Sequence, residues 1–238
     1  MKKLLIIFTL LLSVVSCKQK NTNYPNDPTF SNTGFEVINS TKDSVLLYLT
    51  IGAPFDSTCV QSVDGIFGIP QGSGLQGSVW LQPNEKVTYT PTLFFSGNIG
   101  FGSTPQNCIT SGLPMGMNIF EFTTNVDTAS NESIDVSCVA GANCIMNVKL
   151  IGGPDWISGN AKSIRSIENK PLEYNTGIYG VFPYGCTSCI NTDGIQPCQT
   201  LPTNPNKEKI CLLTRSSNKK GGLIRLTFKG YIEPASKN

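Results

Sequence analysis

Short runs of β-branched and aromatic residues, each ended by turn-forming residues, recur along the chain from Gly34 onward. Such runs are typical of β-strands, and the 23 glycines and 15 prolines supply turns between them. Pro91, inside "KVTYTPTLFF", marks an edge strand or a bulge. The pattern predicts an all-β sandwich or barrel. One segment, "AKSIRSIEN" at 161–169, is instead expected to form a short helix. The clearest strand runs are "FEVIN", "SVLLYLTI", "MNIFEFTT", "ESIDVS", "IMNVKLI" and "GLIRLTF".

Residues 1–17 have the layout of an export signal. Two lysines precede the apolar run Leu4–Leu12, and a small residue precedes Cys17. The apolar run is too short for a stable membrane span. The end of the segment resembles a bacterial lipobox, in which Cys17 is lipidated and becomes the mature N-terminus; a plain signal peptide is the alternative. We expect a lipid anchor at a bacterial outer membrane, on its periplasmic or its cell-surface face, followed by a flexible tether at 18–32.

Eight cysteines remain once Cys17 is set aside from the nine. An even number in an exported chain predicts a disulfide framework. Segment 151–210 is rich in glycine and proline, and we expect cross-links to order it as a disulfide-rich loop region beside a β-sandwich of 33–150 and 211–232. Eight cysteines allow about 105 pairings, so the connectivity stays open, although the turn-rich "VAGAN" suggests a small loop closed by Cys138 and Cys144. The eight are Cys59, Cys108, Cys138, Cys144, Cys186, Cys189, Cys198 and Cys211.

Several function classes are excluded by what the chain lacks. There is no histidine, which rules out histidine-based triads and histidine metal ligands. Without Lys2 and Lys3 the chain has 16 of its 18 basic residues and 16 acidic ones, so its formal net charge is zero. It therefore has no excess of positive charge to attract nucleic acid. "GSGLQG" (72–77) leads into a strand-like run rather than a helix, so we interpret it as a loop. "CTSC" (186–189) lacks the context of a redox or zinc motif. We expect no cofactor and no metal.

Glu121 and Asp135 are the candidate functional acids. Each stands between apolar neighbours in a strand-like run, so each points away from them. If the two runs form one hairpin around residue 128, both acids share its polar face. Directly opposed carboxylates repel unless a cation or ligand compensates, and such pairs also perform glycoside hydrolysis. The alternative is two unrelated, solvent-facing acids on a half-buried sheet.

Four segments resemble the thaumatin-like protein family, in the same order. These are "GFEVINSTKDSVLLYLTIG", "SGLPMGMNIFEFTTN…ESIDVSCVAGANCIMNV", "GVFPYGC" and "GLIRLTFKG". The resemblance implies a flattened β-sandwich with a disulfide-stapled region beside it and an acidic cleft between them. Glu121 matches the family glutamate and Asp135 its first aspartate. The arginine before the glutamate has no counterpart, the next aspartate falls on Ala140, and the usual sixteen cysteines of the family are reduced to eight here.

The resemblance implies a non-catalytic carbohydrate-binding module, for a β-glucan-type polysaccharide, acting as a monomer. Trp156 and Tyr184 lie in loop-like segments, where an aromatic ring could stack on a sugar ring; filling the core under a loop is the alternative for both. A second hypothesis is a weak endo-β-1,3-glucanase with Glu121 as proton donor and Asp135 as second carboxylate. A third is a protein-binding or inhibitory defence module directed at a foreign protein.

Overall fold

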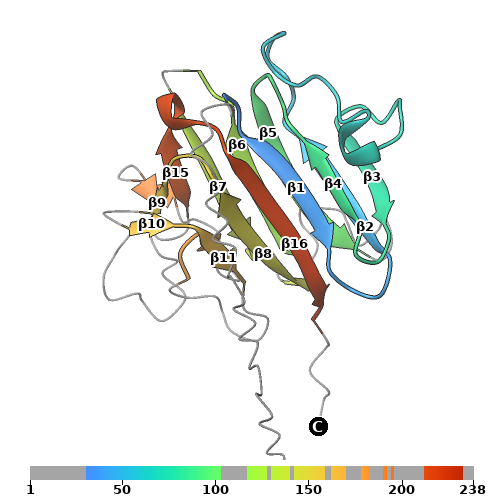
Figure 1. Cartoon of the computed structure of the whole chain (residues 1–238). Coiled ribbons are helices and arrows are strands. Elements are labelled where there is room, and N and C mark those ends of the chain that lie inside the picture. Colours follow the sequence, from blue (N-terminus) through green and yellow to red (C-terminus); the bar gives the residue numbers. More distant parts are fainter. Residues whose placement is uncertain are drawn as a thin grey trace, which may run out of the picture.

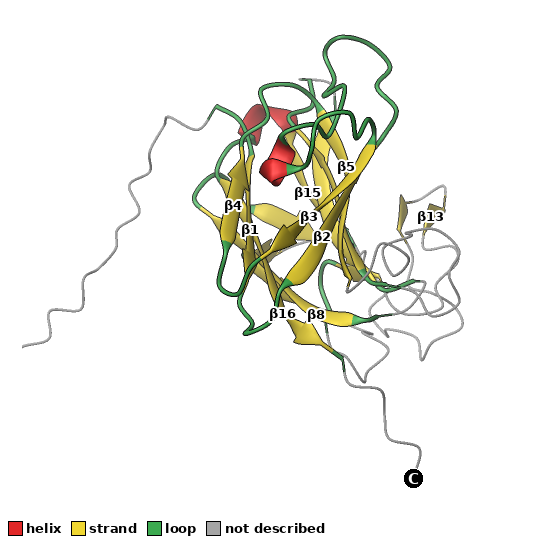
Figure 2. Cartoon of the chain, turned by 90° about the vertical axis from the view of Figure 1, so that its right-hand side faces the viewer, coloured by secondary structure: helices red, strands yellow, loops and turns green. Residues whose placement is uncertain are grey.

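The computed structural model describes residues 31–102, 117–127, 130–139, 142–158, 162–169, 178–182, 190–191, 194–195 and 212–232. In these ranges the regular secondary structure is almost entirely β, and the two larger sheets form two layers that pack face to face (Figure 1). The layers are seen side by side in Figure 2. The predicted all-β sandwich is therefore confirmed. In the described part of the chain no helix has the length and apolar character needed to cross a bilayer.

A five-stranded sheet forms one layer, in the order β11-β8-β16-β1-β4. β1 runs parallel to β16, and the other neighbours in this sheet are antiparallel. Among the described residues β4 is an edge strand that ends before Pro91, in agreement with the sequence prediction. The bounds are β1 Gly34–Asn39, β4 Lys86–Tyr89, β8 Cys144–Ile151, β11 Ser166–Glu168 and β16 Leu223–Tyr231.

A nine-stranded sheet forms the other layer, in the order β10-β9-β15-β7-β6-β5-β2-β3, with β12 paired to β7 as its ninth strand. The bounds are β2 Val45–Ile51, β3 Gln76–Leu81, β5 Phe95–Gly102, β6 Ile119–Thr124, β7 Asn131–Ser137, β9 Trp156–Ser158, β10 Lys162–Ile164, β12 Val181–Phe182 and β15 Leu213–Ser216. The remaining elements are β13 Ile190–Asn191, β14 Gly194–Ile195, and the short 3₁₀ turns η1 Ile66–Gly68 and η3 Ser217–Lys219.

The helix expected at 161–169 is not formed. The segment makes β10 and β11 instead, which pair with β9 and β8 in different sheets. A short isolated helix is marginal in water, whereas the strand pairing buries Ile167 to 2% exposure. The prediction was wrong because tertiary pairing outweighs local helix propensity here. Strands β9 to β11 also fall inside 151–210, so the sheets extend further along the chain than we expected.

Aromatic side chains fill the space between the two layers. Phe95 is fully buried, and its ring lies 5.3 Å from that of Phe35 and 4.7 Å from that of Phe122, centroid to centroid. Phe120 and Phe122 alternate with Glu121 along β6, and both face this core. Because successive side chains of a strand point to opposite faces, the inward aromatic residues place Glu121 on the outer face of the nine-stranded sheet.

A charged network is also buried in the sandwich. Arg215 Nε donates to Glu132 Oε2 at 2.6 Å, and both side chains are almost completely inaccessible to solvent. The guanidinium also donates to Thr33 Oγ1 and to the Gly221 carbonyl. Glu132 in addition accepts the Asn125 N–H at 2.6 Å. The charges are thus paired and hydrogen-bonded, which is the condition for tolerating them in a low-dielectric interior.

Candidate functional site

Glu121 and Asp135 lie directly opposite each other on the outer face of the nine-stranded sheet. They are a cross-strand pair of the antiparallel β6–β7 hairpin, whose register is centred on residue 128 as predicted. Their chain neighbours Phe120 and Ile134 point the other way and are fully buried in the core. The expectation that the two acids share one polar face is therefore confirmed, and two unrelated acids can be excluded.

The two carboxyl groups form one electrostatic unit. Burial raises the pKa of Glu121, which also has side-chain hydrogen bonds with Asp135 and Ser137. Burial raises the pKa of Asp135 well above its ordinary value, and both the charge of Glu121 and the hydrogen bond with it raise it further. Two carboxyl groups on directly opposed side chains repel each other when both are ionised, so one of them keeps its proton to a higher pH. The raised pKa of Asp135 means that this carboxyl keeps its proton to a higher pH than an exposed aspartate does.

No lysine or arginine neutralises this pair among the residues that the structure describes. The opposite sheet provides a contrast. There Glu36, equally buried on the outer face, forms ion pairs with Arg225 and, at 3.3 Å, with Lys86. A buried glutamate is thus neutralised by basic side chains on one sheet. On the other sheet, neutralising the Glu121–Asp135 pair requires a proton or an added ligand.

A row of polar side chains continues from the pair across the neighbouring strands. Asn98 on β5 pairs with Glu121, Thr50 on β2 pairs with Asn98, and Gln76 on β3 pairs with Thr50. We call Gln76, Thr50, Asn98, Glu121 and Asp135 the polar row. Three of its oxygen atoms, Thr50 Oγ1, Asn98 Oδ1 and Asp135 Oδ1, are buried and have no hydrogen-bond partner among the residues that the structure describes. Asp135, at one end of the row, is 5% exposed, the three residues in the middle are half-buried, and Gln76 at the other end is exposed.

The polar row has a hydroxyl-bearing flank and an aromatic flank. On one side Ser96, Thr123 and Ser133 lie opposite one another on three adjacent strands, and Ser96 Oγ and Thr123 Oγ1 are 2.9 Å apart. On the other side Tyr48 donates its hydroxyl to Gln76 Oε1 at 3.4 Å. Tyr48 pairs with Ser78, and Trp80 lies two positions further along the same strand. Trp80 therefore shares this outer face, and it is 48% exposed.

The Trp156 side chain is buried, as the core-filling alternative predicted. Its side chain is 2% exposed, and the guanidinium carbon of Arg215 lies 4.3 Å from the centre of its ring. The sequence interpretation of Trp156 as a loop-borne sugar platform is therefore wrong, because β9 pairs with β10 and β15 and turns the indole inward. Tyr184 and the lipid-anchor candidate Cys17 lie outside the described residues.

Sequence reasoning missed Trp80, Asn98 and Thr50. The signal for Trp80 was present, because alternation in "QGSVWL" gives it the same parity as the polar residues Gln76 and Ser78. No local signal marks Thr50 or Asn98. Their place in the polar row follows from the pairing of β2 with β5. Gly97 permits this close approach, because a Cβ atom there would lie 2.1 Å from the Thr50 carbonyl oxygen.

The expected disulfide between Cys138 and Cys144 is not formed. Cys138 carries a free, fully buried thiol, as does the 3% exposed Cys59. Cys144 Sγ instead lies 3.5 Å from Asn118 Oδ1. Burial, together with the charge of Asp135, raises the pKa of the Cys138 thiol to about 12, so the thiolate required for disulfide exchange is scarce. The other five cysteines of the predicted framework lie outside the described residues: Cys108, Cys186, Cys189, Cys198 and Cys211.

The substitution Asp135→Asn is expected to stabilise the protein above pH 5, and increasingly so as the pH rises. The folded protein holds the Asp135 proton more tightly than the unfolded chain does. The wild-type protein therefore loses stability as the pH rises from about 4, the ordinary value for aspartate, toward the raised pKa. Asparagine has no proton to lose, so the variant escapes this loss.

Thermal unfolding midpoints at pH 4, 6 and 8 would measure this difference. The control is Asp43→Asn, the same change at an exposed position, which should shift the midpoint equally at all three values. A stabilisation by Asp135→Asn that is constant or shrinks with rising pH would contradict the raised pKa of Asp135.

No family model and no curated protein matches the chain. Among solved structures it is similar to the thaumatin-like xylanase inhibitor TLXI, at 13% identity and a TM-score of 0.39, over 82% of this chain and 99% of that one. It is also similar to the protein elicitor MoHrip2 from Magnaporthe oryzae, at 9% identity and a TM-score of 0.39, over 83% and 99% of the two chains. At these identities the likeness concerns the fold alone.

Proposed function

We propose that the chain is a polysaccharide-binding module whose binding surface is the polar row together with Trp80. The observation that carries this proposal is the set of buried oxygens at Thr50, Asn98 and Asp135, which find no hydrogen-bond donor in the described part of the chain. A buried polar atom without a partner costs about 1–3 kcal/mol. A ligand rich in hydroxyl groups supplies donors for these acceptors and removes the cost.

The aromatic flank supports a sugar rather than another polyol. A sugar ring has a hydroxyl-covered edge and an apolar C–H face, and the face packs on an aromatic ring while the edge forms hydrogen bonds. Trp80 presents a half-exposed indole on the same outer face as the polar row. Ser96, Thr123 and Ser133 provide further hydroxyls on the opposite flank. Within the sugars, a β-glucan is the class that the thaumatin-like sequence resemblance suggests.

The geometry of the acid pair argues against hydrolysis. Glycosidases hold their two carboxyl groups about 5–5.5 Å apart when they retain the anomeric configuration and about 6.5–9.5 Å apart when they invert it. Glu121 and Asp135 are directly opposed on neighbouring strands, a position in which Cβ atoms lie about 4.5–5.5 Å apart, so the two carboxyl groups stand side by side on one sheet face rather than on two sides of a cleft. We therefore assign the pair a role in binding, as an acceptor at the closed end of the polar row.

In this proposal the lipid on Cys17 anchors the module at an outer membrane. Residues 18–32 would then act as the tether that holds the sandwich off the lipid surface. The proposed partners are a polysaccharide and, through the lipid, the membrane. Metabolic labelling with a fatty-acid analogue, compared between the full chain and Cys17→Ala, would test the anchor independently of sugar binding.

Trp80→Ala is expected to weaken polysaccharide binding about tenfold or more, because an exposed aromatic anchor dominates such a surface and a tenfold loss corresponds to about 1.4 kcal/mol. Binding of the wild-type chain is first measured on a glycan array that includes β-1,3-glucans, and the best ligand is then used in isothermal titration calorimetry. The proposal fails if the array shows no bound glycan.

The matched control is Ile157→Ala. Ile157 is also exposed, at 43%, but lies on β9, several strands away from β3 in the same sheet. Its removal should leave the affinity unchanged. Equal losses for the two variants would place the binding surface elsewhere on the sandwich.

A further inference from the structure

A pocket of about 190 Å³ opens at one end of the sandwich, beside the point where β2 ends and β5 begins. Its walls come from the loop that follows β2 and from the start of β5. Ten residues line it: seven have apolar side chains, one is a cysteine, one is a glycine, and only Ser96 has a hydroxyl. The side chains that matter most below are those of Ile51, Phe55, Cys59, Val60 and Phe94.

The loop that forms the pocket is pinned to β5 by main-chain hydrogen bonds. The Gly52 N–H donates to the Ser96 carbonyl at 3.0 Å, and the Val60 N–H donates to the Phe94 carbonyl at 2.9 Å. The Phe94 N–H in turn donates to the Thr58 carbonyl at 3.0 Å. These bonds hold both walls in place, so the pocket exists before a ligand arrives, as is usual for small-molecule sites.

The same bonds leave little for a polar occupant. Three of the N–H groups around the pocket are used within the protein, and the Ser96 hydroxyl is engaged with Thr123 at 2.9 Å. A bound water needs two to four polar partners, and a hydroxyl-rich ligand needs at least as many. The hydrogen-bonding pattern therefore favours an uncharged occupant that needs no hydrogen-bond donor from the protein.

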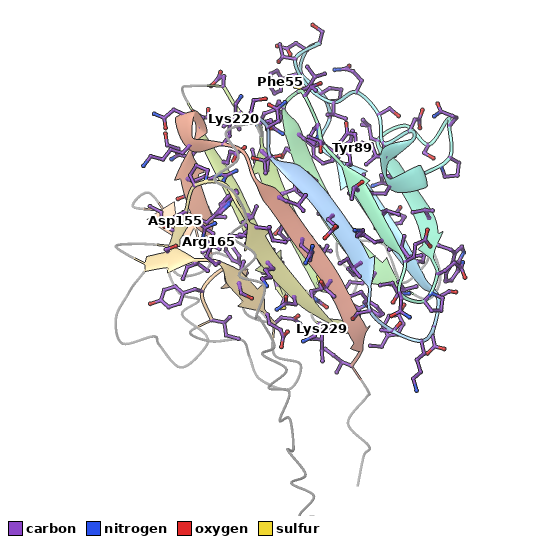
Figure 3. The ribbon with its side chains drawn as sticks, viewed as in Figure 1. Phe55, Tyr89, Asp155, Arg165, Lys220 and Lys229 are labelled. Carbon is purple, nitrogen blue, oxygen red and sulfur yellow. The ribbon has the colours of Figure 1, made fainter. Side chains whose placement is uncertain are left out.

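Phe55 is the most exposed large apolar side chain of the described residues. It is 71% exposed although it lines the pocket, so its ring stands at the rim, and its centroid is 5.5 Å from that of Phe94 at an interplanar angle of 61°. Figure 3 shows Phe55 at the end of the sandwich opposite Lys229. An aromatic ring left in water at the mouth of an apolar pocket gains burial when a ligand enters.

We propose that this pocket binds a small, uncharged aromatic molecule of one or two rings, with Phe55 closing over it. An apolar cavity of about 150 Å³ in another protein is large enough for benzene, so 190 Å³ accommodates a ring of that size or slightly larger. Phe94 offers an edge-to-face partner, and the Cys59 sulfur at the wall offers a polarisable contact to an aromatic ring. This site is separate from the polar row, so the proposal does not depend on sugar binding.

Methyl-resolved NMR of the full chain provides the test, with benzene and indole as probes. We expect saturable shifts of the Ile51 and Val60 methyl groups for both probes. No such shift is expected for myo-inositol, a six-membered carbon ring covered in hydroxyls. Absence of saturable shifts with benzene and indole, or equal shifts with myo-inositol, would overturn the proposal.

Two alanine variants locate the site. Phe55→Ala should weaken indole binding about fivefold or more, and its exposed position makes a folding defect unexpected. Leu93→Ala is the matched control, because Leu93 is an exposed apolar residue next to Phe94 that does not line the pocket. Unchanged affinity in Phe55→Ala, or equal loss in Leu93→Ala, would show that indole binds elsewhere.

Discussion

Arg215→Ala is expected to lower the free energy of unfolding by about 3–5 kcal/mol, the usual cost of leaving one partner of a buried ion pair alone. The Glu132 side chain is 0% exposed and would lose the guanidinium that neutralises it. Thr33 and the Gly221 carbonyl would lose a donor at the same time. Trp156 would lose the cation that lies 4.3 Å from its ring centre. Urea unfolding followed by fluorescence measures the loss.

The matched control for this prediction is Arg165→Ala. Arg165 also pairs with an acid, Asp155, but both side chains are about half exposed, and Figure 3 shows the pair at the surface. Exposed ion pairs contribute about 0–1 kcal/mol because solvent screens them. If Arg215→Ala cost no more than Arg165→Ala, the buried network would not be a determinant of stability.

Phe95→Ala is expected to cost about 3–5 kcal/mol, since it removes a large aromatic side chain from a packed core and leaves a cavity. Phe95 is fully buried, and its ring contacts those of Phe35, Phe122 and Tyr89 at centroid distances of 5.3, 4.7 and 5.4 Å. It joins the two sheets, because it lies on β5 and its ring contacts Phe35 of β1 and Tyr89 of β4. Chemical denaturation again gives the free energy.

Phe55→Ala serves as the control of identical chemistry. Its ring is 71% exposed, so the substitution should change the unfolding free energy by less than about 0.5 kcal/mol. Comparable losses for the two phenylalanines would mean that position in the fold does not decide their contribution. The same measurement establishes that Phe55→Ala is folded for the indole experiment.

The hairpin that carries the acid pair was predictable from sequence. Alternation alone assigns Glu121 and Asp135 to the side opposite their apolar neighbours, and the short segment between the strands leaves few registers for pairing. The structure adds what the pattern could not show. It places Asn98 and Thr50 beside the pair, and these residues come from strands that precede β6 by 17 or more positions in the chain.

The aromatic residues show where sequence reasoning fails. The alternation in "QGSVWL" places Trp80 on the polar face of its strand, but Trp156 lies in "GGPDWISGN", where no local feature tells burial from exposure. Arg215 covers Trp156 from 59 positions away, whereas Trp80 lies on β3, which has only β2 as its neighbour among the described strands. Exposure is thus set by the neighbouring strand and not by the residue's own segment.

By itself the sequence determined that the chain forms strands, and which side chains within each strand share a face, because a period of two is a local property of extended backbone. Only the tertiary structure decided which strands are neighbours. That choice aligned the unpartnered oxygens of the polar row, covered Trp156, left Trp80 half exposed and turned 161–169 into two strands. The physical reason is that strand order depends on how the apolar faces of the whole chain can be buried together, and no single segment contains that information.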